Sequence, residues 1–202
     1  MITSIRSIRR QELLEAALEV MKRDGFHAAT VERVAKECGS SKGIVLHNFR
    51  DKQELILLTL RYAHALRRRD IVERLRKAKS PSERVWAILS VNLGETHLTH
   101  AHCNLWISFT AMALNDAQFA RLQVVIRRRE NSNLLNAFRQ ICSEAEAKRN
   151  TQGIMAMTQA CRLWVGYIAG YDARQAMALM TKYLRSNVPI LGQPFASSPQ
   201  PA

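Results

Sequence analysis

The chain has 202 residues, 47% of them apolar, so it can bury one sizeable core or two small ones and is not expected to be disordered. Thirty Lys and Arg residues against 17 Asp and Glu give a formal net charge of +13, which points to nucleic acid as a partner unless the basic surface serves solubility alone. The four cysteines are scattered without a CxxC pair, which argues against a zinc finger and a disulfide framework. No apolar run is long enough for a membrane span, and no secretory leader is recognised. These features together indicate the cytoplasm.

Residues that break helices are rare, because the chain contains only eight Gly and five Pro. This composition favours long helices over strands and turns. Over residues 7–23 apolar side chains recur every three or four positions, from Leu13 to Met21, which predicts an amphipathic helix. Gly25 follows as a residue that can take a positive φ and end this helix.

Two short helices joined by a tight turn are predicted over residues 30–49. Thr30 can cap the first helix, Ala35 supplies a small contact residue, and Gly39 supplies the turn. Val45 is then expected to point into the core. The residues left facing outward are Ser41, Lys42, Leu46 and His47.

An outward face of short polar and basic side chains at the start of a helix suits the DNA major groove, where donors reach base edges. The alternative is a pair of small packed helices with a solvated face. Arg6, Arg9 and Arg10, ahead of this segment, either reach phosphates or a minor groove or form a solvated charge run. The spacing favours a helix-turn-helix.

The rest of the chain predicts further helices. Asp51 followed three residues later by Glu54 resembles a capping box and starts a long helix that includes the basic segment 67–69. Ser80 and Pro81 suit the start of the next helix. The remaining helical patterns cover residues 82–100, 103–114, 116–147, 151–169 and 172–187.

The predicted fold class is all-α, because no convincing strand and no internal repeat occur in the sequence. We expect a helix-turn-helix domain over residues 1–50 and a larger helical domain over residues 51–188. The final segment, residues 189–202, is rich in Pro and Ser and is predicted to be disordered.

The segment from Thr30 to Phe49 resembles the TetR family of repressors, and the surrounding helix lengths extend the resemblance to about residue 187. It implies a three-helix DNA-binding domain on a larger helical domain that binds a small effector and dimerises. The residues that carry it are Thr30, Val34, Ala35, Gly39, Ser41, Lys42, Gly43, His47, Asn48, Phe49, Lys52, Glu54 and Leu55.

The resemblance also implies which residues contact DNA. Thr30 resembles the family's cap residue that donates to a phosphate, and Lys52 resembles the lysine that grips the backbone. Ser40, Leu46 and Asn48 depart from the family's usual residues and leave the operator sequence open. The implied DNA-binding set is Thr30, Ser41, Lys42, Gly43, Leu46, His47, Asn48 and Lys52.

Aromatic residues of the second half form two pairs at helical spacing, Trp106 with Phe109 and Trp164 with Tyr167. Singly, each is more easily explained as a core residue, but as a group with Met112 they can line an effector pocket. The chain is also similar to the BetI-type members of the family, the choline-responsive repressors of glycine betaine synthesis. The matching stretches are 7–10, 43–44, 47, 49–52, 106 with 109, 121–123, 127–129, 133–134 and 163–164.

This resemblance implies choline or a related quaternary ammonium as the effector. Such a cation donates no hydrogen bonds and is best held by the faces of aromatic rings. Glu95 or Asp116 can supply an acidic side chain next to the bound cation. Thr110 occupies a position where a second aromatic residue is expected. Without that aromatic ring, choline would bind more weakly, or the ligand is another small hydrophobic or cationic molecule. The expected ligand-binding residues are Trp106, Phe109, Met112, Trp164 and Tyr167.

The family resemblance further implies a homodimer in which the last two long helices of each subunit form a four-helix bundle. Small residues mixed with Met allow such helices to approach closely. The dimer would present two DNA-binding helices to palindromic operator DNA. The expected interface residues are Met155, Ala156, Ala160, Ala169, Ala173, Ala176, Met177 and Met180.

Other functional classes fit the sequence less well. One group resembles metal ligands, but its spacing matches no closed metal site, and neither a metal nor a cofactor is predicted. No nucleophile elbow, phosphate-binding glycine loop or pair of carboxylates on one face occurs, so an enzyme is not expected. A non-specific basic DNA-binding protein is the remaining alternative, and it would show no preference among sequences. The metal-like group comprises His97, His100, His102 and Cys103.

Overall fold

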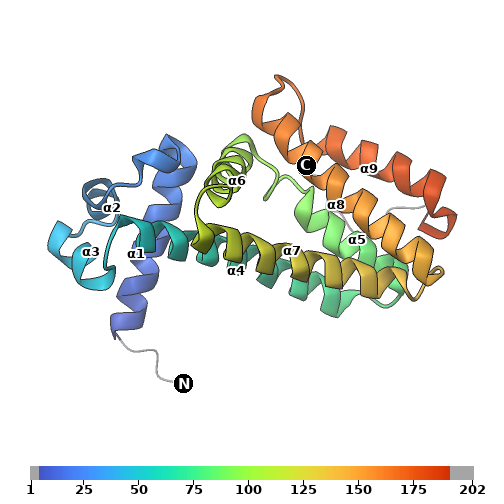
Figure 1. Ribbon diagram of the computed structural model, residues 1–202, viewed down its shortest axis with the longest axis horizontal. Coiled ribbons are helices and arrows are strands. Elements are labelled where there is room, and N and C mark those ends of the chain that lie inside the picture. The colour runs from blue at the N-terminus through green and yellow to red at the C-terminus, as the bar shows by residue number, and fades with distance from the viewer. Residues whose placement is uncertain (1–4, 192–202) are drawn as a thin grey trace. The chain divides into compact units, whose positions relative to one another are not determined.

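The structure, a computed structural model, describes residues 5–191 and contains nine α-helices, two short 3₁₀ helices and no strand within that range (Figure 1). The all-α prediction is confirmed. The elements are α1 (Ile5–Asp24), η1 (Phe26–Ala28), α2 (Val31–Glu37), α3 (Lys42–Asn48), α4 (Lys52–Lys77), α5 (Pro81–Asn92), α6 (His100–Ala113), α7 (Ala117–Phe138), α8 (Glu144–Tyr167), α9 (Ala173–Asn187) and η2 (Pro189–Leu191).

The first helices begin and end where their capping residues predict. Gly25 follows α1 with a φ of +88°, a conformation that side chains with a Cβ rarely adopt. Thr30 caps α2 by accepting a hydrogen bond from the backbone N–H of Arg33 at 3.2 Å. Ser41 caps α3 in the same way through the N–H of Ile44 at 3.4 Å.

The starts of α4 and α5 are also confirmed. Asp51 accepts a hydrogen bond from the backbone N–H of Glu54 at 2.7 Å, and the Glu54 carboxylate accepts one from the N–H of Arg50 at 2.7 Å. α5 begins at Pro81, directly after the Ser80 cap. Each of these signals acts within four residues, which is why the sequence alone predicts them.

The helix predicted over residues 82–100 is shorter than expected. α5 ends at Asn92, and residues 93–99 form turns before α6. Gly94 lies so close to the preceding turn that a Cβ at this position would collide with the carbonyl oxygen of Ser90. The backbone therefore packs against itself where only glycine fits, and the helix stops there.

The helices predicted over residues 116–147 and 151–169 have a different boundary. α7 ends at Phe138, and α8 starts six residues later. Ser143 and Glu146 form a capping box, in which the Ser143 hydroxyl accepts the Glu146 N–H (3.4 Å) and the Glu146 carboxylate accepts the Ser143 N–H (3.0 Å). Satisfying both N–H groups lets a new helix begin at this point.

The chain forms two compact units. Among the described residues, one unit contains residues 5–66 together with 101–123, and the other contains residues 67–100 together with 124–191. α4 and α7 each contribute residues to both units. The functional division predicted at residue 51 differs from this grouping and stays a prediction.

The end of the described chain is more ordered than predicted. η2 follows α9, with Val188 and Leu191 only 4% and 1% exposed. The prediction of a disordered tail is therefore wrong for residues 189–191. The remainder of the predicted tail, residues 192–202, lies outside the described residues.

Helices α1, α2 and α3 pack around one apolar core together with the start of α4, and Figure 1 shows them clustered. Leu13 from α1, Val34 from α2 and Val45 from α3 are completely buried in this core. Leu55 from α4 joins them and is also completely buried. This packing fixes which side of α3 faces the core and which side faces solvent.

Candidate nucleic-acid interface and effector site

The turn between α2 and α3 depends on Gly39, whose φ is +60°. The N–H of Ser40 closes the turn by donating to the carbonyl oxygen of Ala35 at 2.8 Å. A Cβ on Gly39 would meet nothing within 4 Å, so the backbone conformation rather than crowding requires glycine. The turn brings Val34 and Val45 into the same core, as predicted.

The solvent side of α3 carries most of the residues that the sequence predicts to contact DNA. Lys42, Gly43 and His47 are exposed. Leu46 is 48% exposed although it is apolar. Asn48 is half-buried, and its carboxamide donates at 2.8 Å to a carbonyl oxygen one turn back in α3. The face therefore offers a cation, an imidazole and an apolar group side by side.

Thr30 and Ser41, which are also predicted to contact DNA, are the caps of α2 and α3. Each hydroxyl oxygen accepts a backbone N–H through a lone pair, which leaves the hydroxyl proton able to donate. Helix capping and a hydrogen bond to a phosphate oxygen are therefore compatible in the same residue.

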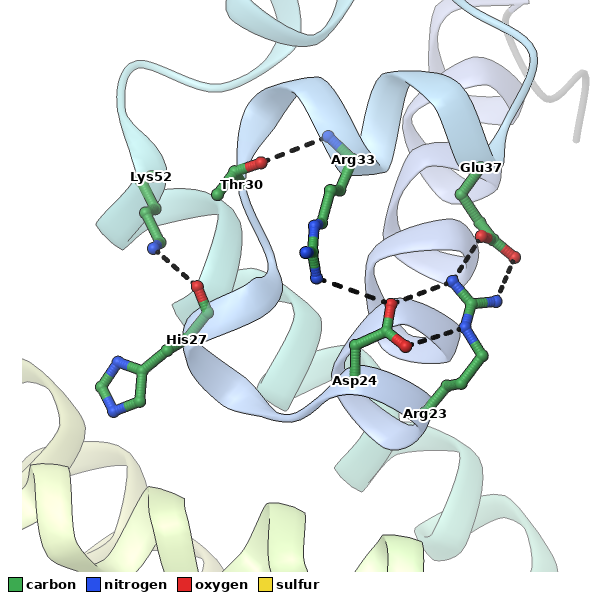
Figure 2. A network of polar contacts seen from close by, with 7 residues as sticks. All are labelled: Arg23, Asp24, His27, Thr30, Arg33, Glu37 and Lys52. Carbon is green, nitrogen blue, oxygen red and sulfur yellow. Dashed lines mark hydrogen bonds and ion pairs between the residues drawn. The ribbon is translucent and has the colours of Figure 1, made fainter.

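Polar contacts connect both ends of α2 with the residues around it (Figure 2). Lys52 donates from Nζ to the carbonyl oxygen of His27 at 3.2 Å, which links α4 to η1. Arg23 donates to Glu37 at 2.9 Å and to Asp24 at 3.1 Å. The hydrogen bond from Arg23 holds the pKa of the Glu37 carboxyl below its usual range. The hydrogen bond to His27 positions the exposed Lys52 ammonium close to the residues that lead into α2.

The arginines that precede this segment contact its folded residues. Arg9 donates a hydrogen bond to the Ser40 hydroxyl at 2.7 Å. Ser40 is one of the three residues that depart from the usual residues of the TetR family, and this contact gives it a structural role. The Arg10 guanidinium lies 5.4 Å from the centre of the Phe49 ring. The side chain of Arg6 lies outside the described residues, and contact of these arginines with DNA stays a prediction.

Trp106 and Phe109 pack edge to face on α6, with ring centroids 5.5 Å apart. Phe109 is 1% exposed and also packs against Phe119 of α7, at 6.4 Å between centroids. Phe109 therefore supports the half-buried Trp106 from the core. Thr110 donates to the Trp106 carbonyl oxygen (2.9 Å) and accepts from Gln123 (3.0 Å), so it links α6 to α7 as a polar group.

Met112, also predicted to bind the ligand, lines an open hollow of about 370 Å³ with Phe26 and His27 of η1 and with Asp116. The Asp116 carboxylate accepts a hydrogen bond from Gln53 of α4 at 2.5 Å. The structure thus brings Met112 and one of the two candidate acidic residues together, next to the residues that lead into α2.

The second aromatic pair differs from the predicted one. Trp164 packs edge to face on Tyr171, with ring centroids 5.4 Å apart, while Tyr167 is 68% exposed. Burial raises the pKa of the Tyr171 phenol, which also lies 3.7 Å from the Cys161 sulfur. Helical spacing did not indicate Tyr171 because this residue lies beyond the end of α8.

The second unit contains a buried charged cluster that the sequence did not reveal. Arg67 of α4 donates to Glu130 of α7 at 2.6 Å, and Arg162 of α8 lies 3.7 Å from the same carboxylate oxygen. Arg162 also donates at 3.4 Å to Asn92 of α5. The three charged side chains are only 4–11% exposed, so four helices meet in one buried polar network.

The residues predicted to form the dimer interface on and beside α8 and α9 differ in exposure. Ala156 and Ala169 are exposed, and Met155, Ala160 and Met177 are half-buried. Ala173, Ala176 and Met180 are buried in their own chain, at 7%, 0% and 0% exposure, so assigning these three to an interface was wrong. Leu163 and Tyr167 instead are 45% and 68% exposed. They are four residues apart and therefore lie on one side of α8.

Two sequence families cover most of the chain. Residues 13–59 match the family of bacterial regulatory proteins called tetR, and residues 81–189 match the C-terminal family of BetI-type transcriptional repressors. The regulator BetI of Serratia proteamaculans is 34% identical over 182 residues, which are 88% of this chain and 91% of that protein. The BetI of Brucella melitensis is 34% identical over 196 residues, or 95% and 96%. This chain belongs to the TetR family.

The predicted family, including its BetI-type branch, is thereby confirmed, and the protein is a TetR-family helix-turn-helix transcriptional regulator rather than an enzyme. A TetR-like fold is confirmed as well. A transcriptional regulator from Saccharomonospora viridis, solved in complex with choline, matches 90% of this chain and 98% of its own with a TM-score of 0.81 at 17% identity. At this identity the likeness concerns the fold alone.

The histidine-rich segment of this TetR-family chain contacts an acidic residue. His97 lies 2.7 Å from the Asp70 carboxylate. Within residues 5–191, no three His, Cys, Asp or Glu side chains gather as metal ligands would. In the same part of the chain, no helix combines the length and the apolar character that crossing a membrane requires.

Proposed function

We propose that this TetR-family protein is a homodimeric, ligand-responsive repressor that binds palindromic operator DNA through α3. The observation that carries the proposal is the division of α3 into two sides. Val45 is completely buried, whereas Leu46 is 48% exposed and Lys42 and His47 are exposed. A short helix held by its inner side, with polar, basic and apolar groups outside, suits the major groove.

The proposed contacts divide by chemistry. Hydroxyl and ammonium groups suit phosphate oxygens, the imidazole and the carboxamide suit base edges, and an exposed leucine suits the methyl group of thymine. A glycine in α3 lets the backbone come close to the DNA. The proposed set is Thr30, Ser41, Lys42, Gly43, Leu46, His47, Asn48 and Lys52.

We propose a quaternary ammonium effector, with choline as the first candidate and control of choline-to-betaine genes as the role. The similarity to BetI regulators supports this chemistry, and the Saccharomonospora viridis regulator shows that a protein of this fold can bind choline. Each aromatic face contributes about 0.5–2 kcal/mol to binding such a cation. The proposed ligand-binding residues are Trp106, Phe109, Met112, Trp164 and Tyr167.

Control of DNA binding is proposed to pass through α4, a single helix of 26 residues. Its first residues contact η1, which leads into α2, and the residue that precedes α7. Lys52 donates to the His27 carbonyl oxygen, and Gln53 donates to Asp116. A displacement of α4 on effector binding would therefore move the helix-turn-helix and change the spacing of the two α3 helices in the dimer.

The proposed dimer uses the exposed side of α8 that carries Leu163, which is 45% exposed. A two-fold axis through such an interface relates two α3 helices, which then meet half-sites about one DNA turn, or roughly 34 Å, apart. Operator DNA would place the working protein in the cytoplasm.

The effector proposal is tested by the melting temperature of the protein with millimolar choline or millimolar ethanolamine. Ethanolamine lacks the three methyl groups, so an aromatic cage should raise the melting temperature with choline only. The Trp106→Phe variant keeps an aromatic face and should retain part of the rise, whereas Trp106→Leu should lose it. No rise with choline would point to another small hydrophobic or cationic ligand.

The DNA proposal is tested by selecting duplexes from a random library at physiological salt. A repressor should enrich one palindromic sequence, and its affinity for that site should exceed the non-specific affinity by at least about a thousandfold. Enrichment of no sequence would favour the alternative of a non-specific basic DNA-binding protein, whose affinity falls steeply with salt.

A further inference from the structure

An ion pair joins the beginnings of α2 and α3. The Lys42 ammonium lies 2.5 Å from the Glu32 carboxylate. Lys42 is the first residue of α3, and Glu32 is the second residue of α2. The two side chains are 58% and 60% exposed, so water reaches both charges. Glu32 also has its carboxyl pKa held below the usual range, first of all by the hydrogen bond from Lys42.

The second glutamate of α2 provides a comparison within the same helix. Glu37 receives hydrogen bonds from Arg23 of α1 at 2.9 and 3.2 Å, as Figure 2 shows. The side chains of Glu37 and Arg23 are 31% and 56% exposed. Glu32 and Glu37 are therefore the same residue type on the same short helix, but only Glu32 pairs with a cation of α3.

We propose that Glu32 limits the sequence-independent affinity of the protein for DNA by competing with phosphate for the Lys42 ammonium. This inference rests on the proposed function, in which Lys42 contacts DNA. An exposed ion pair contributes little to stability, so phosphate can displace Glu32. When phosphate takes the Lys42 ammonium, the Glu32 carboxylate loses its ion pair and remains close to the negatively charged DNA. Every duplex therefore binds more weakly than it would to a protein without Glu32.

The high positive charge of the chain explains why weaker non-specific DNA binding would be useful. A protein with a formal charge of +13 is attracted to any duplex, and a genome contains a large excess of non-specific sites. A carboxylate that occupies one cation of α3 in the free protein reduces this attraction. Contacts to base edges are not reduced, because they do not involve the ammonium–phosphate interaction.

The test measures binding to a fluorescein-labelled 24-base-pair duplex of random sequence by anisotropy, between about 50 and 300 mM KCl. One added phosphate contact changes the slope of log K against log salt by about 0.9, which corresponds to roughly eightfold in affinity at 0.1 M salt. The Glu32→Gln variant should therefore bind about three- to eightfold more tightly at 0.1 M, with a steeper salt dependence. The Glu37→Gln variant is the matched control and should bind like the wild type.

A second pair of variants shows whether Glu32 acts through Lys42. Lys42→Gln should weaken binding, and adding Glu32→Gln to Lys42→Gln should then raise the affinity by clearly less than Glu32→Gln does in the wild type. The inference is overturned if Glu32→Gln binds no more tightly than the wild type, if Glu37→Gln gains as much, or if the full gain persists without Lys42. Circular dichroism melts of all variants confirm that each one is folded.

Failure of the inference and failure of the proposed function are distinguishable. The random duplex needs no operator, so the Glu32 comparison can be made whatever sequence the protein prefers. If library selection enriches no sequence, the proposed repressor function fails, while the comparison of Glu32→Gln with Glu37→Gln still decides the role of Glu32.

Discussion

Single residues with local effects determine the DNA-binding segment. Gly39 sets the turn through its φ of +60°, and the caps Thr30 and Ser41 set the starts of the two helices. Gly43, four residues after Gly39, lies inside α3, and a Cβ there would make only an ordinary contact with the Ser41 hydroxyl oxygen at 3.8 Å. The backbone conformation therefore requires glycine at position 39, whereas the structure has room for a side chain at position 43.

Replacing these two glycines should change stability in opposite directions. Gly39→Ala places a Cβ in the left-handed region and should lower the free energy of unfolding by about 1 kcal/mol. Gly43→Ala should raise it by about 0.5–1 kcal/mol because alanine favours the helix interior. Urea denaturation measures both values, and a destabilised Gly43→Ala would contradict the absence of crowding. Gly43→Ala should nevertheless weaken DNA binding if the backbone approaches the DNA there.

The sequence predicts these features because each acts over a few residues. Gly25, Gly39, Thr30 and Ser41 all have the roles that their positions suggested. The role of Ser40 was not predictable, because its hydroxyl accepts from Arg9, which lies 31 residues earlier in the chain. A contact of this separation depends on how α1 packs, and no local pattern contains that information.

Pairs of helices are held by interactions that the sequence pattern does not show. Arg67 belongs to a basic run, yet it is buried against Glu130, 63 residues later. The boundary between α7 and α8 was missed although the Ser143–Glu146 capping box is local, because the apolar pattern continues through it. Periodicity thus predicted that helices exist, whereas packing and caps decided where they end.

The buried cluster should contribute strongly to the stability of the second unit. Glu130→Gln removes the carboxylate that Arg67 and Arg162 share, and the loss of one partner of a buried ion pair costs about 3–5 kcal/mol. Glu73→Gln is the control, because its pair with Lys77 is 64–75% exposed and should change little. Urea denaturation of both variants makes the comparison, and similar losses would contradict a buried role for Glu130.

The start of α8 should make stability depend on pH. Hydrogen bonding by Arg139 lowers the pKa of the Glu144 carboxyl from 4.5 to about 2. Since the folded pKa is depressed, the ionised carboxylate stabilises the folded state above the unfolded value and loses this effect as the pH falls from about 4.5 towards 2.

Melting temperatures of the wild type and Glu144→Gln should therefore differ above pH 5 and converge near pH 2. In the Arg139→Gln background, Glu144→Gln should change the melting temperature less at every pH above about 5, because the largest cause of the lowered Glu144 pKa is removed. Equal curves for the wild type and Glu144→Gln at all pH values would show that the pair does not act on stability.

At the scale of the whole molecule, the family assignment follows from motifs, but the surface for assembly does not. Small and apolar residues along α8 and α9 suggested an interface, yet Ala173, Ala176 and Met180 pack inside their own chain. Amphipathic helices in a single sequence do not show whether an apolar side meets its own chain or a second copy. Exposure in the fold makes this distinction and selects Leu163.

The proposed dimer predicts that a charge on this side of α8 separates the subunits. Leu163→Asp would place two carboxylates, one from each subunit, in a two-fold interface where water is excluded. Light scattering after gel filtration should then give the mass of a monomer at micromolar concentration, and affinity for a palindromic duplex should fall at least about tenfold. Leu114→Asp is the matched control, because Leu114 is 82% exposed beyond the end of α6 and outside the proposed interface. A dimer that persists in Leu163→Asp, or dissociates equally in Leu114→Asp, would exclude this side of α8 as the contact between subunits.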